Sequence, residues 1–344
     1  MLCLRMQSKA IGRSLIAMPL LFIAAALMTH AGLIEAQTVN WVDASPPAAR
    51  SFSGMTYDGA THSVVMFGGA GDNSATYGDT WIWSGGWLRL SPVAAPSPRQ
   101  GLAMAYDGAA GNVVLFGGCT NNSTACTYLN DTWTWDGTTW TQQFPSVSPS
   151  PRVSYMAYDE ATKTVVLFGG NNGAGALGDT WTWDGVAKTW TPQNPSASPS
   201  VRLAPVAWDR ATSNVVLFGG GNLHPSAGPG TAYGDTWNWN GTTWTQQFPA
   251  SSPSARSGAA ITYDAGLGLL VLFGGAVNGS WEESANDTWT WNGSDWTQVH
   301  PATVPSNRYN FGMAFDPEAK AALMFGGFST AAARGGTWLL ALAP

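Results

Sequence analysis

The chain has 344 residues, of which 10% are charged, and its formal net charge at pH 7 is −6. A chain this acidic lacks the basic surface that binding to a nucleic-acid backbone requires, so we expect no nucleic-acid partner. Its abundant Gly (41) and Trp (19), with no sustained helical periodicity, favour an all-β fold over a helical one.

The first 36 residues show the pattern of a secretory signal peptide. Basic residues precede an almost unbroken apolar run over residues 15–28, and Ala31 and Ala36 are candidate cleavage points. An uncleaved anchor is the alternative, but the run is shorter than the roughly 20 residues of a membrane span. We therefore expect a secreted or periplasmic protein whose mature part, residues 37–344, is one domain with no membrane span.

Residues 37–344 contain one block of about fifty residues six times over. Most copies carry an Arg, an aromatic stretch that ends in Asp, an apolar run that closes on Gly-Gly, and the motif Asp-Thr-Trp-x-Trp. A repeat of this period is typical of a solenoid or a propeller. The copies begin near Arg50, Arg99, Arg152, Arg202, Arg256 and Arg308.

Each copy is expected to form four short strands, a to d, separated by turns. In the third copy these are residues 154–158, 164–168 and 179–183, followed by a strand at Trp190. Antiparallel strands place the a–b and c–d turns at one face and the b–c and d–a connections at the other. The step from the Gly pair to strand c ranges from 9 to 15 residues, so the b–c loops are the variable surface. We expect the binding site on that face, which also carries the six arginines.

Most tryptophans recur with the repeat: 17 of the 19 occupy positions on strands c and d. Residues i and i+2 of a strand share a face, so each Trp-x-Trp is predicted to point two indoles between neighbouring blades. The last copy has no Trp on strand d, and Trp41 is the one left to supply it. A strand over residues 39–42 would then complete the last blade and remove an open edge.

With Gly-Gly, Arg and Trp in phase six times, the mature chain resembles the kelch-repeat family of β-propellers. The Asp-Thr-Trp-x-Trp strand is most similar to secreted bacterial kelch-like proteins, often described by similarity to the propeller domain of galactose oxidase. The resemblance implies an all-β, six-bladed propeller with four antiparallel strands per blade, the last blade completed by the N-terminal strand. It leaves function open, since kelch propellers include protein-binding scaffolds, lectin-like modules and a few enzymes.

Two cysteines of the mature chain, Cys119 and Cys126, lie seven positions apart in one loop. In an oxidising compartment a local disulfide is the natural interpretation, and two free thiols are the alternative. A zinc site is disfavoured, because two Cys without a nearby His provide too few ligands.

Enzyme chemistry finds little support in the residue pattern. The galactose oxidase resemblance implies a copper held by two Tyr and two His, with one Tyr cross-linked to a Cys. That ligand set is not carried over, because the mature chain has only three His: His62, His224 and His300. Glycoside hydrolysis needs two facing carboxylates, and the Glu residues are scattered or adjacent: Glu160, Glu282, Glu283 and Glu318. We expect no catalytic residue, no metal and no cofactor.

Binding fits the pattern better, because six diverse loops stand on one face of a rigid disc. Trp281 lies outside the repeat positions, in the loop 277–286 beside Glu282 and Glu283, and could hold a sugar ring or a peptide. The alternative is that Trp281 packs on a neighbouring blade. His224, in the loop 221–234, is a weaker candidate.

The six arginines could bind an acidic peptide or a uronic acid, or could pair with Asp within the framework. We expect an exported, monomeric, non-catalytic propeller that binds a protein or a glycan. A carbohydrate-active enzyme is the alternative.

Overall fold

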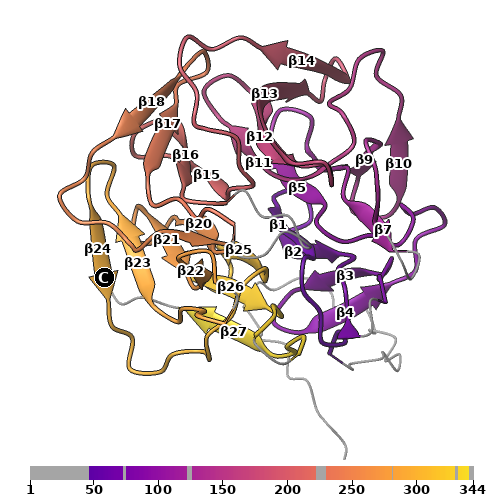
Figure 1. The fold of residues 1–344 in the computed structure, drawn as a ribbon. Coiled ribbons are helices and arrows are strands. Elements are labelled where there is room, and N and C mark those ends of the chain that lie inside the picture. The colour runs from indigo at the N-terminus through magenta and orange to yellow at the C-terminus, as the bar shows by residue number, and fades with distance from the viewer. Residues whose placement is uncertain are drawn as a thin grey trace, which may run out of the picture. The chain divides into compact units, whose positions relative to one another are not determined.

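Each repeat folds into one small antiparallel sheet, because its β-prone runs are short and separated by turn residues. The computed structural model describes residues 46–72, 75–121, 126–221, 230–280, 282–329 and 332–340. Within these residues six sheets, called blades 1 to 6, lie around a common axis with their first strands innermost (Figure 1). The chain is therefore an all-β, six-bladed propeller, as predicted.

The first three blades follow the chain order. Blade 1 is β1 (Gly54–Asp58), β2 (Ser63–Phe67), β3 (Thr80–Trp83) and β4 (Trp87–Leu90). Blade 2 is β5 (Ala103–Asp107), β6 (Asn112–Phe116), β9 (Thr132–Trp135) and β10 (Trp140–Gln143), with the added hairpin β7 (Cys119–Asn121) and β8 (Cys126–Tyr128). Blade 3 is β11 (Val153–Asp159), β12 (Thr164–Asn171), β13 (Ala176–Asp184) and β14 (Thr189–Gln193).

The other three blades complete the ring. Blade 4 is β15 (Val206–Asp209), β16 (Asn214–Phe218), β17 (Thr236–Trp239) and β18 (Trp244–Gln247). Blade 5 is β20 (Ala260–Asp264), β21 (Leu269–Phe273), β23 (Thr288–Trp291) and β24 (Trp296–Val299), with the short ribbon β19 (Arg256–Ser257) and β22 (Ala276–Val277). Blade 6 is β25 (Gly312–Asp316), β26 (Ala321–Phe325) and β27 (Thr337–Leu340). The predicted signal peptide, the strand over 39–42 and Trp41 lie outside the described residues.

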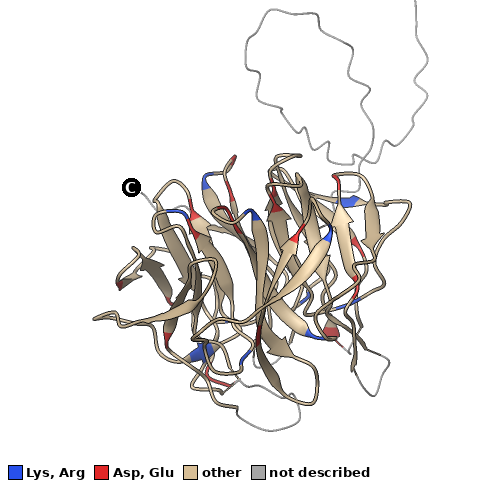
Figure 2. Ribbon diagram, turned by 90° about the horizontal axis from the view of Figure 1, so that it is seen from above, with Lys and Arg blue, Asp and Glu red and all other residues tan. Residues whose placement is uncertain are grey.

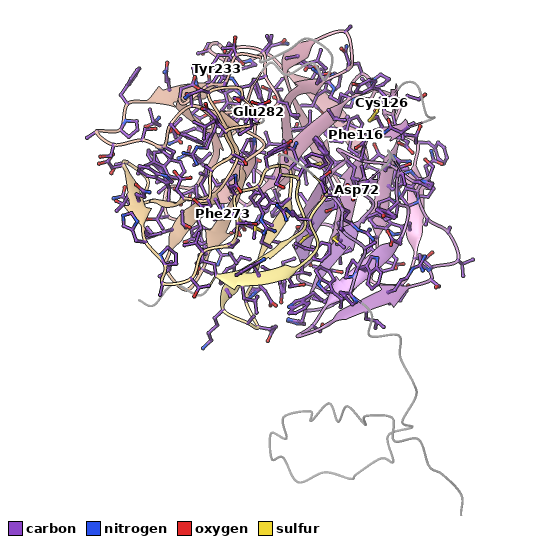
Figure 3. The ribbon with its side chains drawn as sticks, turned by 60° about the horizontal axis from the view of Figure 1, so that its bottom comes forward. Asp72, Phe116, Cys126, Tyr233, Phe273 and Glu282 are labelled. Atoms are coloured by element: carbon purple, nitrogen blue, oxygen red, sulfur yellow. A yellow bond between two sulfur atoms is a disulfide. The ribbon has the colours of Figure 1, made fainter. Side chains whose placement is uncertain are left out.

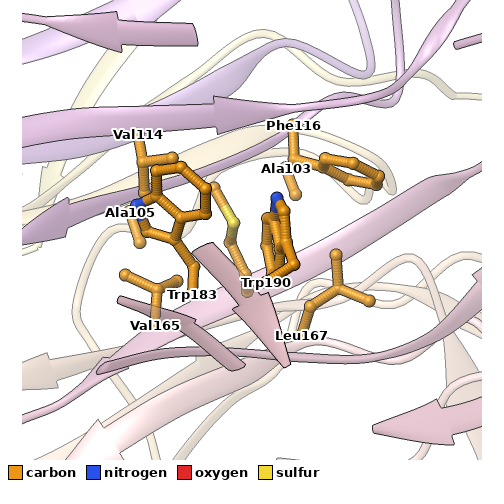
Figure 4. Close-up of a cluster of buried hydrophobic side chains, with 9 residues drawn as sticks. Ala103, Ala105, Val114, Phe116, Val165, Leu167, Trp183 and Trp190 are labelled. Carbon is orange, nitrogen blue, oxygen red and sulfur yellow. The ribbon is translucent and has the colours of Figure 1, made fainter. Parts of the chain in front are cut away.

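The core consists of clusters between neighbouring blades rather than one central core. In the cluster of Figure 4, Phe116 of blade 2 lies against Trp190 of blade 3, and Trp183 lies on the other side of Trp190; all three side chains are buried. Both indoles of a Trp-x-Trp pair reach the same cluster, as predicted, since Trp181 packs against it beside Trp183. Large aromatic side chains fill the space that widens with distance from the axis.

Each indole of a strand-d tryptophan donates a hydrogen bond to a strand-c threonine hydroxyl of the preceding blade. The five N–O distances are 2.7–3.0 Å, and the pairs are Trp87–Thr337, Trp140–Thr80, Trp190–Thr132, Trp244–Thr180 and Trp296–Thr236. A buried indole N–H needs an acceptor, and here the neighbouring blade supplies it. These bonds therefore fix the position of each blade against the preceding one.

Blade 1 closes the ring by packing on blade 6. Trp87 donates to Thr337 Oγ1 at 2.7 Å, and its ring meets that of Phe325 edge to face with centroids 5.3 Å apart. Nearer the axis the backbone N–H of Phe52 donates to the carbonyl of Asn310 at 2.7 Å. The described residues therefore join the first and last repeats directly.

Candidate functional site

The propeller has two distinct ends, which we name by the connections they carry. The loop face carries the d–a connections, with the six arginines, and the b–c loops that follow the Gly pairs; the turn face carries the a–b and c–d turns. Residues after each arginine pair with residues after the Gly pair, for example Ser51 with Ala70 and Ser257 with Ala276. This confirms the predicted division of connections between the faces. Figure 2 shows most charged residues near the strand ends and in these connections.

Five of the six arginines are held in the same constellation, which we call the arginine clamp. Its members are the arginine, the first Gly carbonyl of the pair, the Asp that precedes strand c, and the Trp two residues after that Asp. In blade 2, Arg99 Nη1 donates to the Gly117 carbonyl at 3.0 Å and to Asp131 Oδ1 at 2.6 Å, and its Nη2 donates to Oδ2 at 2.8 Å. The indole of Trp133 donates to the same Oδ2 at 2.7 Å.

The clamp repeats with little variation. The five arginine side chains are 1–2% exposed, whereas the paired carboxylates are 11–42% exposed. The pairs are Arg50–Asp79, Arg99–Asp131, Arg152–Asp179, Arg202–Asp235 and Arg256–Asp287. This geometry matches the framework alternative for these five arginines, because each planar guanidinium fork is filled by a carboxylate of the same blade. Their contact with a ligand stays a prediction.

In four blades the clamp favours the ionised form of its carboxyl. Burial alone would raise the pKa of Asp131, but the hydrogen bonds and charge of Arg99, with the Trp133 indole, outweigh burial and lower that pKa. The same balance lowers the pKa of Asp79, Asp179 and Asp287. Since the pKa of each carboxyl falls on folding, these ion pairs stabilise the folded state at neutral pH.

The Gly pair is required by the close approach of neighbouring backbones at the clamp. Gly117 has φ +62°, and a Cβ built on it would lie 2.6 Å from the carbonyl oxygen of Arg152 in the next blade. Any residue with a Cβ would be strained at this φ and would clash with that carbonyl. The recurring Gly-Gly is therefore a joint between blades and not a ligand loop.

The b–c loops differ from blade to blade, as their lengths predict. In blade 2 the loop forms the β7–β8 hairpin, closed by a disulfide between Cys119 and Cys126, which agrees with the predicted pairing. In blade 3 the strands themselves extend, and Asn171 pairs with Ala176. Figure 3 labels Asp72, Cys126, Tyr233 and Glu282, which come from four different b–c loops.

The candidate ligand residues of the blade 5 loop are only partly described. Glu282 and Glu283 are both exposed, and the Glu283 carbonyl accepts the N–H of Val277 at 2.7 Å. Trp281 lies outside the described residues, and so does His224. The predicted contact of these four residues with a ligand stays a prediction.

A second concave site, which sequence reasoning missed, lies along the propeller axis. The first strands of all six blades line a cavity of about 730 Å³ that reaches the a–b turns. At the loop-face end the space narrows to a cavity of about 30 Å³, where backbone hydrogen bonds such as Gly101 N–H to Phe52 carbonyl at 2.8 Å run from blade to blade. The larger cavity therefore reaches the turn face and not the loop face.

Six half-buried aromatic residues, one per blade, ring the turn-face end of this channel. Each precedes the last Asp of its first strand: Tyr57, Tyr106, Tyr158, Trp208, Tyr263 and Phe315. The sequence signal that could have found this ring is its period, since one aromatic residue directly precedes the strand-a Asp in every copy. The strand-a Asp residues themselves accept backbone N–H groups of the a–b turn, as Asp159 Oδ1 does from Ala161 at 2.9 Å.

Polar side chains near the rim of the channel lie in pairs. Arg210 donates to Glu160 at 2.7 Å, and His62 Nδ1 lies 3.3 Å from Glu318. Burial, followed by the charge of Glu318, raises the pKa of the Tyr57 hydroxyl. The phenol is thus a neutral hydrogen-bonding group at physiological pH.

No group of three or more His, Cys, Asp or Glu with metal-site geometry occurs among the described residues. In the same part of the chain, no helix has the length and apolar character needed to cross a bilayer.

Comparison with known proteins agrees with the fold. A family model described as the KLHDC2/KLHL20/DRC7 Kelch-repeats domain matches residues 84–247, from the c–d turn of blade 1 to the end of β18. A search of curated proteins found no match. The Arg, Gly-Gly and Trp positions of the matched region recur in the repeats outside it. Propellers of this kind are typically protein-binding scaffolds.

Proposed function

We propose that this six-bladed propeller of kelch repeats is an exported binding module that docks a protein partner on its loop face. The match to a kelch-repeat domain supports a protein-binding role. The predicted signal peptide supports export, as in the secreted bacterial kelch-like proteins that the Asp-Thr-Trp-x-Trp strand resembles. The disulfide between Cys119 and Cys126 is consistent with an oxidising compartment.

One observation carries the choice of face. On the loop face a nearly identical clamp recurs under loops that differ in length and in structure, such as the disulfide hairpin of blade 2 and the extended strands of blade 3. A rigid framework that presents diverse loops is the usual construction of a recognition surface. The turn face, by contrast, carries short turns capped by the strand-a Asp residues.

A binding role rather than hydrolysis is supported by what the framework carboxylates do. The clamp Asp residues accept two guanidinium bonds and one indole bond, as Asp179 does from Arg152 and Trp181. A carboxylate held in this way is not available as a general acid, because its proton affinity is reduced.

The test is a binding screen followed by matched alanine variants. The mature protein is applied to immobilised peptides and glycans, and the best protein-derived ligand is titrated against three forms of the propeller. Replacing Glu282 and Glu283 together by Ala should weaken binding at least tenfold, since both are exposed on the loop face. Replacing Glu160 and Glu318 by Ala removes the same charge from the turn face and should leave affinity unchanged.

The opposite pattern, with loss only in the turn-face variant, would move the docking site to the channel. Turnover of a glycan by the mature protein would instead favour a carbohydrate-active enzyme.

A glycan-binding channel is the second candidate, and it is favoured by the aromatic ring. Sugar rings stack on aromatic faces, and the channel of about 730 Å³ carries one aromatic side chain from each blade. In this case Trp208→Ala should abolish glycan binding, while Trp237→Ala, on the third strand of the same blade (β17) and not part of the channel lining, should not.

A further inference from the structure

Blade 6 lacks the acidic member of its clamp. Thr337 pairs with Phe325 and Trp338 with Met324, just as Thr80 pairs with Phe67 and Trp81 with Met66 in blade 1. The residue before Thr337 is Gly336, where the other five blades have Asp before the corresponding Thr. The clamp of blade 6 therefore has its arginine and its indole but no carboxylate.

The donors that face the missing carboxylate remain in place. Arg308 is 2% exposed, and its Nε donates to the Ser306 carbonyl at 3.0 Å, Nη1 to the Gly326 carbonyl at 2.9 Å and Nη2 to Ser306 Oγ at 3.1 Å. These are the bonds that the arginines of blades 2 to 5 make besides the carboxylate. One N–H on each Nη is left without an acceptor among the described residues, and so is the indole N–H of Trp338.

The five complete clamps show what these three donors bind. There Nη1 lies 2.5–2.6 Å from Oδ1, Nη2 lies 2.8–3.2 Å from Oδ2, and the indole nitrogen lies 2.7 Å from Oδ2. A planar group with two oxygens fits this arrangement, because the guanidinium fork matches it with two parallel bonds.

The vacant position is open and positively charged. Gly336 is exposed, and a Cβ built on it would meet only Trp338 Nε1, at 3.7 Å. Where blades 1 and 4 place a Tyr ring over the clamp arginine, blade 6 has the exposed Arg334, whose Nε donates to Ser329 Oγ at 2.9 Å. Asp72 of the adjacent loop accepts the backbone N–H of Ala333 at 2.9 Å and has no ion pair with either arginine.

We propose that blade 6 binds a carboxylate of the protein partner in the position that an Asp side chain fills in the other blades. This seat consists of Arg308, Trp338 and Arg334. The inference rests on the proposed function and adds the chemistry of the ligand: an acidic side chain or a C-terminal carboxylate. Burial and then the charge of Arg334 lower the pKa of Arg308 to about 10, so the guanidinium stays protonated at neutral pH and gains from an anion.

The seat is tested with small carboxylates, without the partner. N-acetylaspartate amide, N-acetylglycine, glucuronate and the neutral N-acetylasparagine amide are each titrated into the mature protein. The observed signal is the Trp338 indole N–H in proton–nitrogen NMR, assigned through Trp338→Phe. We expect a saturable shift with the aspartate or the glycine derivative, at a Kd on the order of 1 mM, and none with the asparagine derivative.

Two matched variants separate the seat from general effects on the fold. Trp338→Phe removes one of three donors and should weaken binding about tenfold, measured through the ligand signals. Trp289→Phe removes the same indole donor from blade 5, where Asp287 fills the seat, and should leave the affinity unchanged. Arg308→Met should abolish binding in protein whose other indole signals are retained.

Absence of a saturable shift, an equal shift with the asparagine derivative, or equal weakening by Trp289→Phe would overturn the seat. Tighter binding of glucuronate than of both peptide mimics would overturn its assignment to a protein ligand. If the seat were overturned in this way, the proposed function would still stand, provided that binding of a protein partner required Glu282 and Glu283. If a partner bound without using the loop face while small carboxylates still bound at the seat, the proposed function would be overturned but the seat would stand.

Discussion

Removing the carboxylate of one arginine clamp should destabilise the propeller strongly. Asp131→Ala deletes the acceptor of two bonds from Arg99 and one from Trp133, and leaves a guanidinium that is 1% exposed without its counter-charge. Removing one partner of a buried ion pair costs about 3–5 kcal/mol. Because Asp131 is 22% exposed, water partly replaces it, and we expect a loss near the lower end, about 3 kcal/mol.

The assay is urea unfolding at pH 7, with two companion variants. Asp136→Ala removes an exposed Asp of the same blade that accepts only the N–H groups of Thr138 and Thr139 and the Thr138 hydroxyl, and should cost about 1 kcal/mol or less. Adding Arg99→Met to Asp131→Ala removes the buried charge as well, so the double variant should lose clearly less than the sum of the two single losses. Equal losses for Asp131→Ala and Asp136→Ala, or additive losses in the cycle, would refute this account of the clamp.

Three further predictions concern the framework. The pKa of four clamp carboxyls, those of Asp79, Asp131, Asp179 and Asp287, is lowered on folding, so their stabilisation is complete above the unfolded value of about 3.9 and is lost as pH falls below it. Urea unfolding should show falling stability between about pH 4 and pH 2, and a flat profile there would contradict this prediction. Replacing Cys119 and Cys126 by Ser opens a short closed loop and should lower the free energy of unfolding by at most about 2–3 kcal/mol in the same assay. A reducing agent should leave the stability of this double variant unchanged. Trp190→Phe should cost about 1–3 kcal/mol more than Trp183→Phe, because only Trp190 donates a buried bond, to Thr132, while the Trp183 indole N–H has no acceptor among the described residues; equal losses would show that ring volume alone decides.

The blade count and the division of faces could be predicted because they depend on the period and on antiparallel order alone. The pattern in Trp181 and Trp183 placed both indoles between blades, and the spacing of Cys119 and Cys126 indicated their disulfide. The structure added that blade 3 continues its strands past the Gly pair to Asn171, through an irregularity between Phe168 and Gly170. A bulge of this kind leaves no clear mark in a pattern of period two.

The site was harder to predict, because five of the six copies contain two recurring Asp residues with different partners. Asp107 accepts backbone N–H groups of a turn, whereas Asp131 binds Arg99, and residue type does not separate the two roles. The channel was missed because its aromatic residues were read as strand positions, although Tyr57 and its equivalents recur at the axis in every blade. The substitution of Gly336 for Asp was visible in the sequence, but its meaning depends on knowing that Asp is the counter-charge of a buried arginine.

Hydrogen–deuterium exchange of the mature protein, with and without the best protein-derived ligand of the binding screen, tests the central claim most directly. Docking on the loop face predicts slower exchange in the b–c loops, including residues 277–284 and 332–338, with unchanged exchange in the a–b turns. Protection confined to the a–b turns and the first strands around the channel would contradict the claim and place the ligand at the opposite end of the propeller.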